Sequence, residues 1–156
     1  TDFNDQDPGR AAIKEMLINI MGEDYYYSGY PMKSLMDEGV IVSSSTDAPA
    51  AEEFEGSILN VIEVATTGMA PEDDGQPFAP DELISVKDAL KALTINGAWQ
   101  LGLEEERGSI KVGKYADFVV IDTNFLDYEG DELKTIHSAN ILNTYFEGQQ
   151  VYPAIE

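Results

Sequence analysis

The sequence contains no cysteine, and that absence excludes disulfide bonds and metal sites built from thiolates. Histidine is almost as scarce, since His137 is the only one in 156 residues. No apolar run approaches the roughly 18 residues that a membrane-spanning helix needs, so we expect no membrane span. The hydrophobic share of 43% is nevertheless ordinary for a globular protein, and it predicts a folded chain with a core of its own.

Basic residues are also few, because 9 lysines and arginines stand against 30 aspartates and glutamates, a net charge of −21. This balance argues against nucleic acid as a partner, since binding it requires basic groups that neutralise phosphates. It argues equally against anionic membrane surfaces. The acids are spread along the chain, which is typical of a solvated surface, with adaptation to high salt as the alternative.

Four segments show the apolar spacing of helices, over residues 11–21, 31–38, 52–67 and 85–101. The last is the clearest, because Ser85 and Asp88 form a capping-box pattern at its start and Gly102 suits its end. Asn96 and Trp99 are its two unusual members, and we expect Trp99 to lie in the core.

Two loops carry alternatives that the sequence leaves open. The aromatic segment from Tyr25 to Tyr30 would line a substrate pocket, or it would be a plug that packs a helix against a sheet. The segment 68–80, rich in proline, glycine and acid, would be a lid or a solvated excursion, and we favour the excursion.

After Gly108 the sequence pattern becomes typical of β-strands. We expect strands over 109–111, 118–121 and 140–146, the second of them buried, and a last strand over 149–152 that follows the hairpin turn Glu147-Gly148. The sequence therefore predicts two parts, an α/β portion over residues 1–102 and small β-structure over residues 103–156.

The stretch from Gly39 to Pro49 is the strongest candidate for chemistry. Its β-branched run, Val40-Ile41-Val42, is typical of a strand buried on both faces of a parallel sheet, and hydroxyl residues then lead to Asp47. Parallel α/β folds place their active sites at the C-terminal ends of strands, so we predict a functional carboxylate at Asp47. The alternative is that Asp47, between a strand and a proline, belongs to a turn or a helix cap.

Three blocks of sequence occur in an order and spacing that chance does not readily explain. They run from Tyr30-Pro31 through Ser34–Val40 to Ser45–Pro49, from Ser85–Leu90 to Thr94–Ala98, and over Gly108–Asp122 with Tyr145–Tyr152 closing the chain. Together they resemble the C-terminal part of a metal-dependent amidohydrolase, within the subgroup that includes N-substituted formamide deformylases. The resemblance implies an α/β fold. It would consist of the last strand and helices of a TIM barrel, followed by part of a small β-sandwich.

The resemblance also implies a role for Asp47. At this position the family's aspartate binds a divalent metal, usually zinc, and takes a proton from the metal-bound water. Two departures stand out: Ser45-Thr46-Asp47 replaces the family's Gly-Ser-Asp, and no His-x-His motif is present. Zinc needs at least three protein ligands even in an open site, and we expect His137 to be a surface or structural residue rather than a ligand. We therefore expect no metal to be bound by this chain alone.

The sequence starts at Thr1 without an initiator methionine or a basic-then-apolar leader, which indicates a removed leader or a piece of a longer protein. We expect a cytoplasmic, C-terminal region of a hydrolase that acts on non-peptide, amide-like C–N bonds. Its partner would be the N-terminal remainder of the same polypeptide, or a second copy, and alone it would be inactive. The alternative is an autonomous, non-catalytic acidic interaction module that begins near Thr1.

Overall fold

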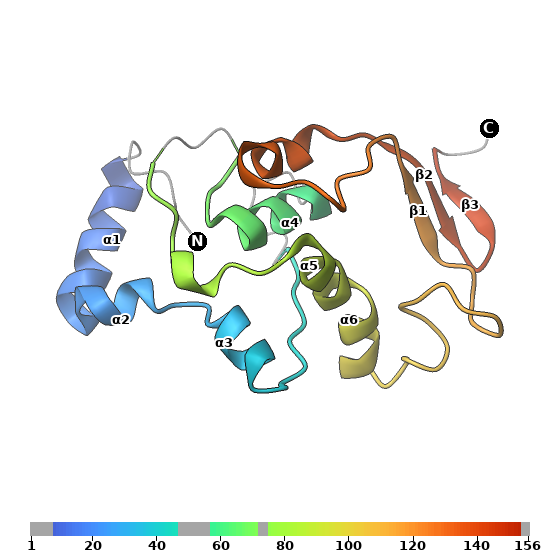
Figure 1. The fold of residues 1–156 in the computed structure, drawn as a ribbon, viewed down its shortest axis with the longest axis horizontal. Helices are drawn as coiled ribbons and strands as arrows, with labels where there is room; N and C mark the ends of the chain where they lie inside the picture. Colours follow the sequence, from blue (N-terminus) through green and yellow to red (C-terminus); the bar gives the residue numbers. More distant parts are fainter. Residues whose placement is uncertain (1–7, 47–56, 72–74, 154–156) are drawn as a thin grey trace.

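A computed structural model describes residues 8–46, 57–71 and 75–153 as a mixed arrangement of helices and strands. Figure 1 shows α1 and α2 at one end of the molecule and a small sheet at the other. The elements are α1 Pro8–Met21, α2 Glu23–Tyr27, α3 Met32–Asp37, α4 Ile58–Thr67, η2 Pro80–Glu82, α5 Val86–Leu93, α6 Ile95–Gln100, β1 Phe118–Ile121, η3 Gly130–Ser138, β2 Ile141–Phe146 and β3 Gln149–Tyr152. In this described part, none of the helices has the length and apolar character of a membrane span.

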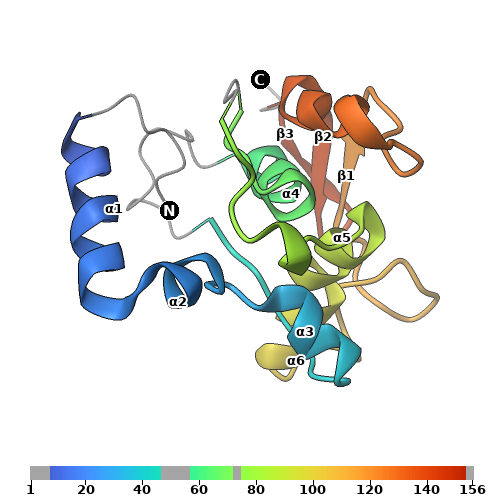
Figure 2. The ribbon, with the colours of Figure 1, turned by 60° about the vertical axis from the view of Figure 1, so that its left-hand side comes forward.

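The main core forms where α4 meets α5 and η3, which Figure 2 shows side by side. Each large apolar side chain buried in it stabilises the fold by about 1.5–3 kcal/mol relative to exposure. The cluster consists of Leu59, Ile62, Ile84, Val86, Ala89, Phe125 and Ile136. It thus joins residues from before and after position 102, while the predicted division into 1–102 and 103–156 stays a prediction.

A charged side chain lies within the same buried face of α4. The Glu63 side chain is only 2% exposed, and its Oε2 lies 2.8 Å from both the backbone nitrogen and the Nδ1 of His137. A buried carboxylate is costly unless hydrogen bonds and an opposite charge or dipole compensate it. The pair therefore joins α4 to η3 at a defined register and gives His137 the structural role that the sequence predicts.

The sheet is antiparallel, with the order β1-β2-β3. Phe118 of β1 stacks on Tyr145 of β2 with their ring centroids 4.5 Å apart. Glu147 and Gly148 both have positive φ, 51° and 78°, as a two-residue type I′ hairpin turn requires. The predicted strands 118–121, 140–146 and 149–152 are confirmed. The predicted burial of the first is wrong, because its two central residues, Val119 and Val120, are 47% and 38% exposed.

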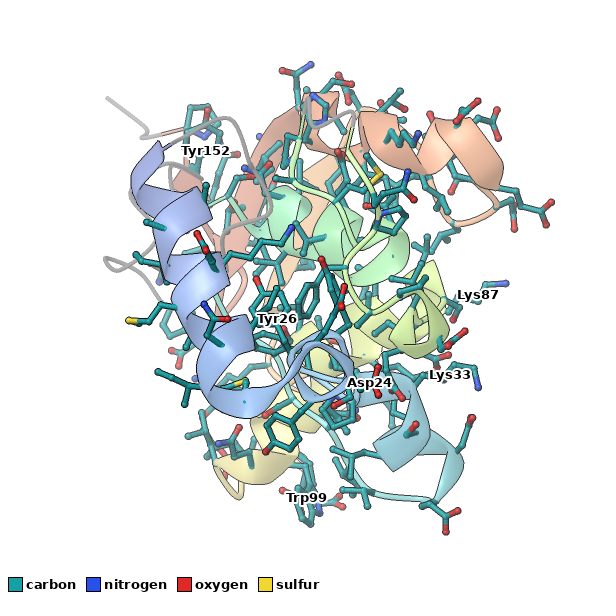
Figure 3. The ribbon with its side chains drawn as sticks, turned by 90° about the vertical axis from the view of Figure 1, so that its left-hand side faces the viewer. Asp24, Tyr26, Lys33, Lys87, Trp99 and Tyr152 are labelled. Atoms are coloured by element: carbon teal, nitrogen blue, oxygen red, sulfur yellow. The ribbon has the colours of Figure 1, made fainter. Side chains whose placement is uncertain are left out.

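The predicted helices are confirmed where the structure describes them, with one correction. Ser85 caps α5 as expected, since its Oγ accepts the backbone N–H of Asp88 at 3.1 Å. The single helix expected over 85–101 is instead two, because Thr94 leaves helical geometry with φ −123° and ψ −91°. The change of direction turns Trp99 outward, so the prediction that it lies in the core is wrong: it is 51% exposed, and Figure 3 shows it at the edge of the molecule.

Two predicted strands do not form. Residues 40–46 and 109–111 lie outside any ladder, and Val40, Ile41 and Ile110 are 48%, 46% and 91% exposed. A buried parallel strand requires neighbours on both sides, and the three strands within the described ranges pair only with one another. The prediction of a parallel sheet is therefore not met there, and the sheet that does form is antiparallel.

The sequence predicts a loop for the aromatic segment, but its first part, Tyr25–Tyr27, belongs to helix α2. Its rings pack against a loop rather than a sheet. Tyr26, Tyr27 and Tyr30 surround Phe78 with ring centroids 5.4, 5.8 and 6.2 Å away, edge-on or tilted. Phe78 comes from the segment 68–80, where its backbone N–H donates to the carbonyl of Gly68 at 2.8 Å. The tyrosine rings and Phe78 pack directly against one another, which favours the plug over the substrate pocket. The plug packs against the segment 68–80 and not against a sheet.

The segment between α6 and β1 is held by one arginine. Arg107 pairs with Asp117 and Glu147, and its guanidinium stacks 4.4 Å from the Tyr115 ring centroid. The backbone N–H of Glu147, with further help from Arg107, lowers the pKa of Asp117 below its usual value. These contacts fix the segment 107–117 against the hairpin turn while leaving the tip at Ile110 exposed.

Gly108 lies where this segment touches α6, and we predict that alanine there is destabilising. Its φ is +79°, and an added Cβ would lie 2.7 Å from the Cβ of Ala98 and 2.9 Å from the Cα of Ile95. Gly108→Ala should lower the free energy of unfolding by about 2 kcal/mol or more in urea titrations. The control is Gly102→Ala, at φ +70° with open space around it, which should cost only about 1 kcal/mol. Equal losses would show that the contact with α6 is not what requires glycine.

Removing the imidazole partner of Glu63 should also destabilise the chain. We expect His137→Leu to lower the free energy of unfolding by about 1–3 kcal/mol, because the buried carboxylate keeps the backbone N–H but loses the ring donor. In a double-mutant cycle with Glu63→Leu, the double variant should be more stable than the sum of the two single losses predicts. Additive losses would mean that the two side chains are not coupled.

Candidate functional site

The predicted site residue, Asp47, lies outside the described residues, so the structure shows the approach to it and not the residue itself. That approach is the extended segment from Gly39 to Thr46, which leaves the end of α3 and passes α5 and α6 (Figures 1 and 2). It begins at Gly39, whose φ of +80° turns the chain out of α3. The assignment of Asp47 as a catalytic carboxylate therefore stays a prediction.

Three hydrogen bonds attach this segment to the two helices. The side-chain amide of Asn96 donates to the carbonyl of Val42 at 2.8 Å, and the N–H of Ser44 donates to the carbonyl of Ala92 at 3.1 Å. The hydroxyl of Ser43 donates to the side-chain oxygen of Gln100. Three successive residues, which end three positions before Asp47, are thus tied to residues about 50 positions later in the chain.

The helix break at Thr94 makes these contacts possible. In a continuous helix the carbonyl of Ala92 would accept the N–H four residues later, and the break leaves it free for Ser44. The hydroxyl of Thr94 donates back to the carbonyl of Leu90 at 2.6 Å, which favours the end of α5 at this point. Sequence reasoning marked Asn96 as unusual but gave it no role, because the role depends on the break.

A shallow groove of about 320 Å³ follows the same segment. Its charged groups are already paired, since Lys91 lies 2.9 Å from Asp88. The hydroxyl of Ser85, with further help from Lys91, lowers the pKa of Asp88, so this carboxylate stays ionised and is held by these two side chains. The groove is lined by Met36, Asp37, Gly39, Val40, Ile41, Asp88, Lys91 and Asn96. None of these lining residues pairs a nucleophile with a base, so the groove has no catalytic arrangement of its own.

A second groove, of about 460 Å³, lies between α4 and the sheet and includes His137. The imidazole already contacts Glu63 through Nδ1, which accounts for one of its two nitrogens. Sequence reasoning missed Glu63, although it falls at the spacing of the buried positions Leu59, Ile62 and Thr66 in α4. A charged residue at such a position is the signal that would have identified the pair.

The described residues do not fit a metal site by themselves. Within residues 8–46, 57–71 and 75–153, no three histidines, aspartates or glutamates come together as ligands. A catalytic zinc needs three protein ligands, and His137 is committed to Glu63. Any metal centre that uses Asp47 would therefore need ligands from outside the described part.

Comparison with known proteins agrees with the sequence blocks described above. Residues 7–152 match the Amidohydrolase family. An N-substituted formamide deformylase of Arthrobacter pascens is 35% identical over 76% of this chain, and the Arabidopsis thaliana protein LONG AFTER FAR-RED 3 is 36% identical over 80%. A solved amidohydrolase structure from Thermotoga maritima matches 78% of the chain with a TM-score of 0.54 and 26% identity.

These matches cover only part of each relative. The chain spans 20% of the length of the deformylase and of the Arabidopsis protein, and 25% of the Thermotoga maritima chain. The similarity nevertheless includes almost every residue from α1 to β3, and it confirms the resemblance to N-substituted formamide deformylases and other amidohydrolases. The chain belongs to the Amidohydrolase family.

Proposed function

We propose that this chain is the aspartate-bearing portion of a hydrolase that cleaves C–N bonds in non-peptide, amide-like substrates. The observation that carries the proposal is the family match over residues 7–152, which includes the segment leading to Asp47. Support for the bond type comes from the deformylase, whose name gives N-substituted formamides as the substrates of that protein. The same class of substrate is the first to test here.

In this proposal Asp47 supplies one carboxylate to the reaction, as a ligand of a divalent metal and as a general base. A carboxylate suits both tasks because it binds hard cations and accepts protons. The metal, which we propose to be zinc, would be held mainly by residues outside the described part of the chain. What this chain contributes is the backbone that presents Asp47, fixed by the contacts of Val42, Ser43 and Ser44 with α5 and α6.

We propose as partner the remaining portion of an amidohydrolase polypeptide, because several rigid apolar side chains face solvent. Ile110 and Val112 are 91% and 103% exposed at the tip of the segment that Arg107 holds in place, and Leu101 is 73% exposed. Two such side chains on one short segment, Ile110 and Val112, are the part of this surface that we propose another part of the polypeptide covers. Most of the length of the relatives lies outside the match, so in those proteins other parts of the polypeptide are long enough to cover such a surface. Alone, the chain would be inactive.

The proposal is tested in a chimera of the Arthrobacter pascens deformylase whose matching fifth is replaced by this chain. We expect the chimera to hydrolyse an N-substituted formamide and to retain zinc after dialysis. Asp47→Asn should lower kcat by about 100-fold or more, since a general base typically contributes 10²–10⁴-fold. The matched control is Asp37→Asn, on the exposed end of α3, which should leave kcat unchanged.

Two results would overturn the proposal. One is an active chimera in which Asp47→Asn has no effect, which would exclude a catalytic role for that carboxylate. The other concerns this chain by itself, which should retain no stoichiometric zinc. Tight binding of one zinc that Asp47→Ala abolishes would show that the chain completes a centre on its own.

The proposal that another part of the polypeptide covers Ile110 and Val112 leads to a separate prediction. Changing both to aspartate should alter the free energy of unfolding of this chain by less than about 0.5 kcal/mol, because neither side chain is buried. In the chimera the same change should lower the thermal midpoint and the zinc content, while the charge control Lys111→Glu should not. An unaffected chimera would contradict the proposed partner. Self-association of this chain that the double change abolishes would also contradict it and would identify a second copy instead.

A further inference from the structure

Asn96 makes one of the contacts that hold the segment before Asp47, but the proposed function assigns its side chain no individual role. It follows the helix break by two residues, it is partly buried, and its Nδ2 donates to the carbonyl of Val42 at 2.8 Å. Asparagine is a weak helix former, so its presence on α6 is not explained by helical propensity. The one described contact that uses its polarity is this bond to the carbonyl 54 positions earlier in the chain.

The carbonyl of Val42 lies on the segment that ends at Asp47. An extended chain advances by about 3.3–3.6 Å per residue, so the five steps from Val42 place Asp47 within about 18 Å of the bond. No ladder holds the described residues 40–46, so their position depends on individual contacts. The N–H of Val40 donates to the carbonyl of Leu35 at the start of the segment, and the contacts with α5 and α6 follow. The Ser43–Gln100 contact is exposed, where a hydrogen bond competes with water and contributes little. The bond from Asn96 and the bond from Ser44 to Ala92 are therefore two of the contacts that fix the segment.

We propose that Asn96 is a positioning residue for Asp47, acting through the carbonyl of Val42. The inference rests on the proposed function of Asp47, but the contact by which Asn96 acts lies wholly within the described residues. Its chemistry is specific, because only a side chain with an N–H or O–H donor at this distance satisfies the carbonyl. A residue that merely filled space on α6 would be replaced by leucine without loss.

The first test uses this chain and hydrogen exchange measured by mass spectrometry. Asn96→Leu keeps a similar volume and removes the donor. We expect amide exchange in residues 42–46 to rise by about tenfold, while exchange in α4 stays as in the wild type. The control is Ile136→Val, which trims a fully buried side chain and should raise exchange in the core, including α4, rather than selectively in 42–46. If Asn96→Leu leaves residues 42–46 unchanged, or raises exchange in α4 to the same degree, the positioning role is wrong.

The second test separates this inference from the proposed function by measuring kcat and KM in the deformylase chimera. Asn96→Leu should lower kcat about tenfold or more and leave KM within about twofold, because a displaced Asp47 affects the reaction rather than binding. Asn96→Ser, which restores a donor on a shorter side chain, should recover part of the loss. If Asp47→Asn has no effect on kcat while Asn96→Leu still loosens residues 42–46, the proposed function fails and the contact stands. If Asp47→Asn abolishes kcat but Asn96→Leu does not lower it, the inference fails and the proposed function stands.

Discussion

The break in the helical run at Thr94 determines how the parts of this chain meet. A helix that continued through residue 94 would close the carbonyl of Ala92 within its own ladder and would carry Asn96 in another direction. With the break, Ser44 and Val42 find their partners on α5 and α6, and Gly108 fits against the first turn of α6. One departure from regular geometry thus arranges two segments that lie more than 60 residues apart in sequence.

The buried pair of Glu63 and His137 has a comparable effect on the other side of the core. The carboxylate of Glu63 requires donors, and both described donors belong to one residue of η3. Because an unsatisfied buried charge is so costly, η3 has few alternative positions against α4. The apolar cluster around Leu59 and Ile136 supplies most of the stabilisation, but side chains of that kind tolerate small shifts. The hydrogen-bonded pair of Glu63 and His137 gives the packing its register.

Local features of the fold were predictable from the sequence. The capping of α5 by Ser85 and the hairpin at Glu147-Gly148 depend on neighbours in sequence, and both are confirmed. The strand predicted from Val40-Ile41-Val42 is not formed, since a ladder depends on a second strand that a one-dimensional pattern does not supply. The outward position of Trp99 follows from the helix break at Thr94, and the contact of Asn96 depends on a distant segment, so the sequence pattern did not predict either. Glu63 was the exception, since its charge at a buried spacing of α4 was a readable signal.

The open sheet also bears on how copies of this chain behave toward one another. Within the described ranges, the outer edges of β1 and β3 have no strand beside them, and such edges are templates for aggregation. Asp117 and Asp122 stand at the two ends of β1, where charged residues act as gatekeepers. The backbone N–H of Glu147 lowers the pKa of Asp117, and the side chain of Asn140 lowers the pKa of Asp122. Both carboxylates therefore stay ionised in mildly acidic solution. The negative charge of Asp122 at the end of β1, which disfavours edge pairing between copies, is thus retained there, while Asp117 stays paired with Arg107.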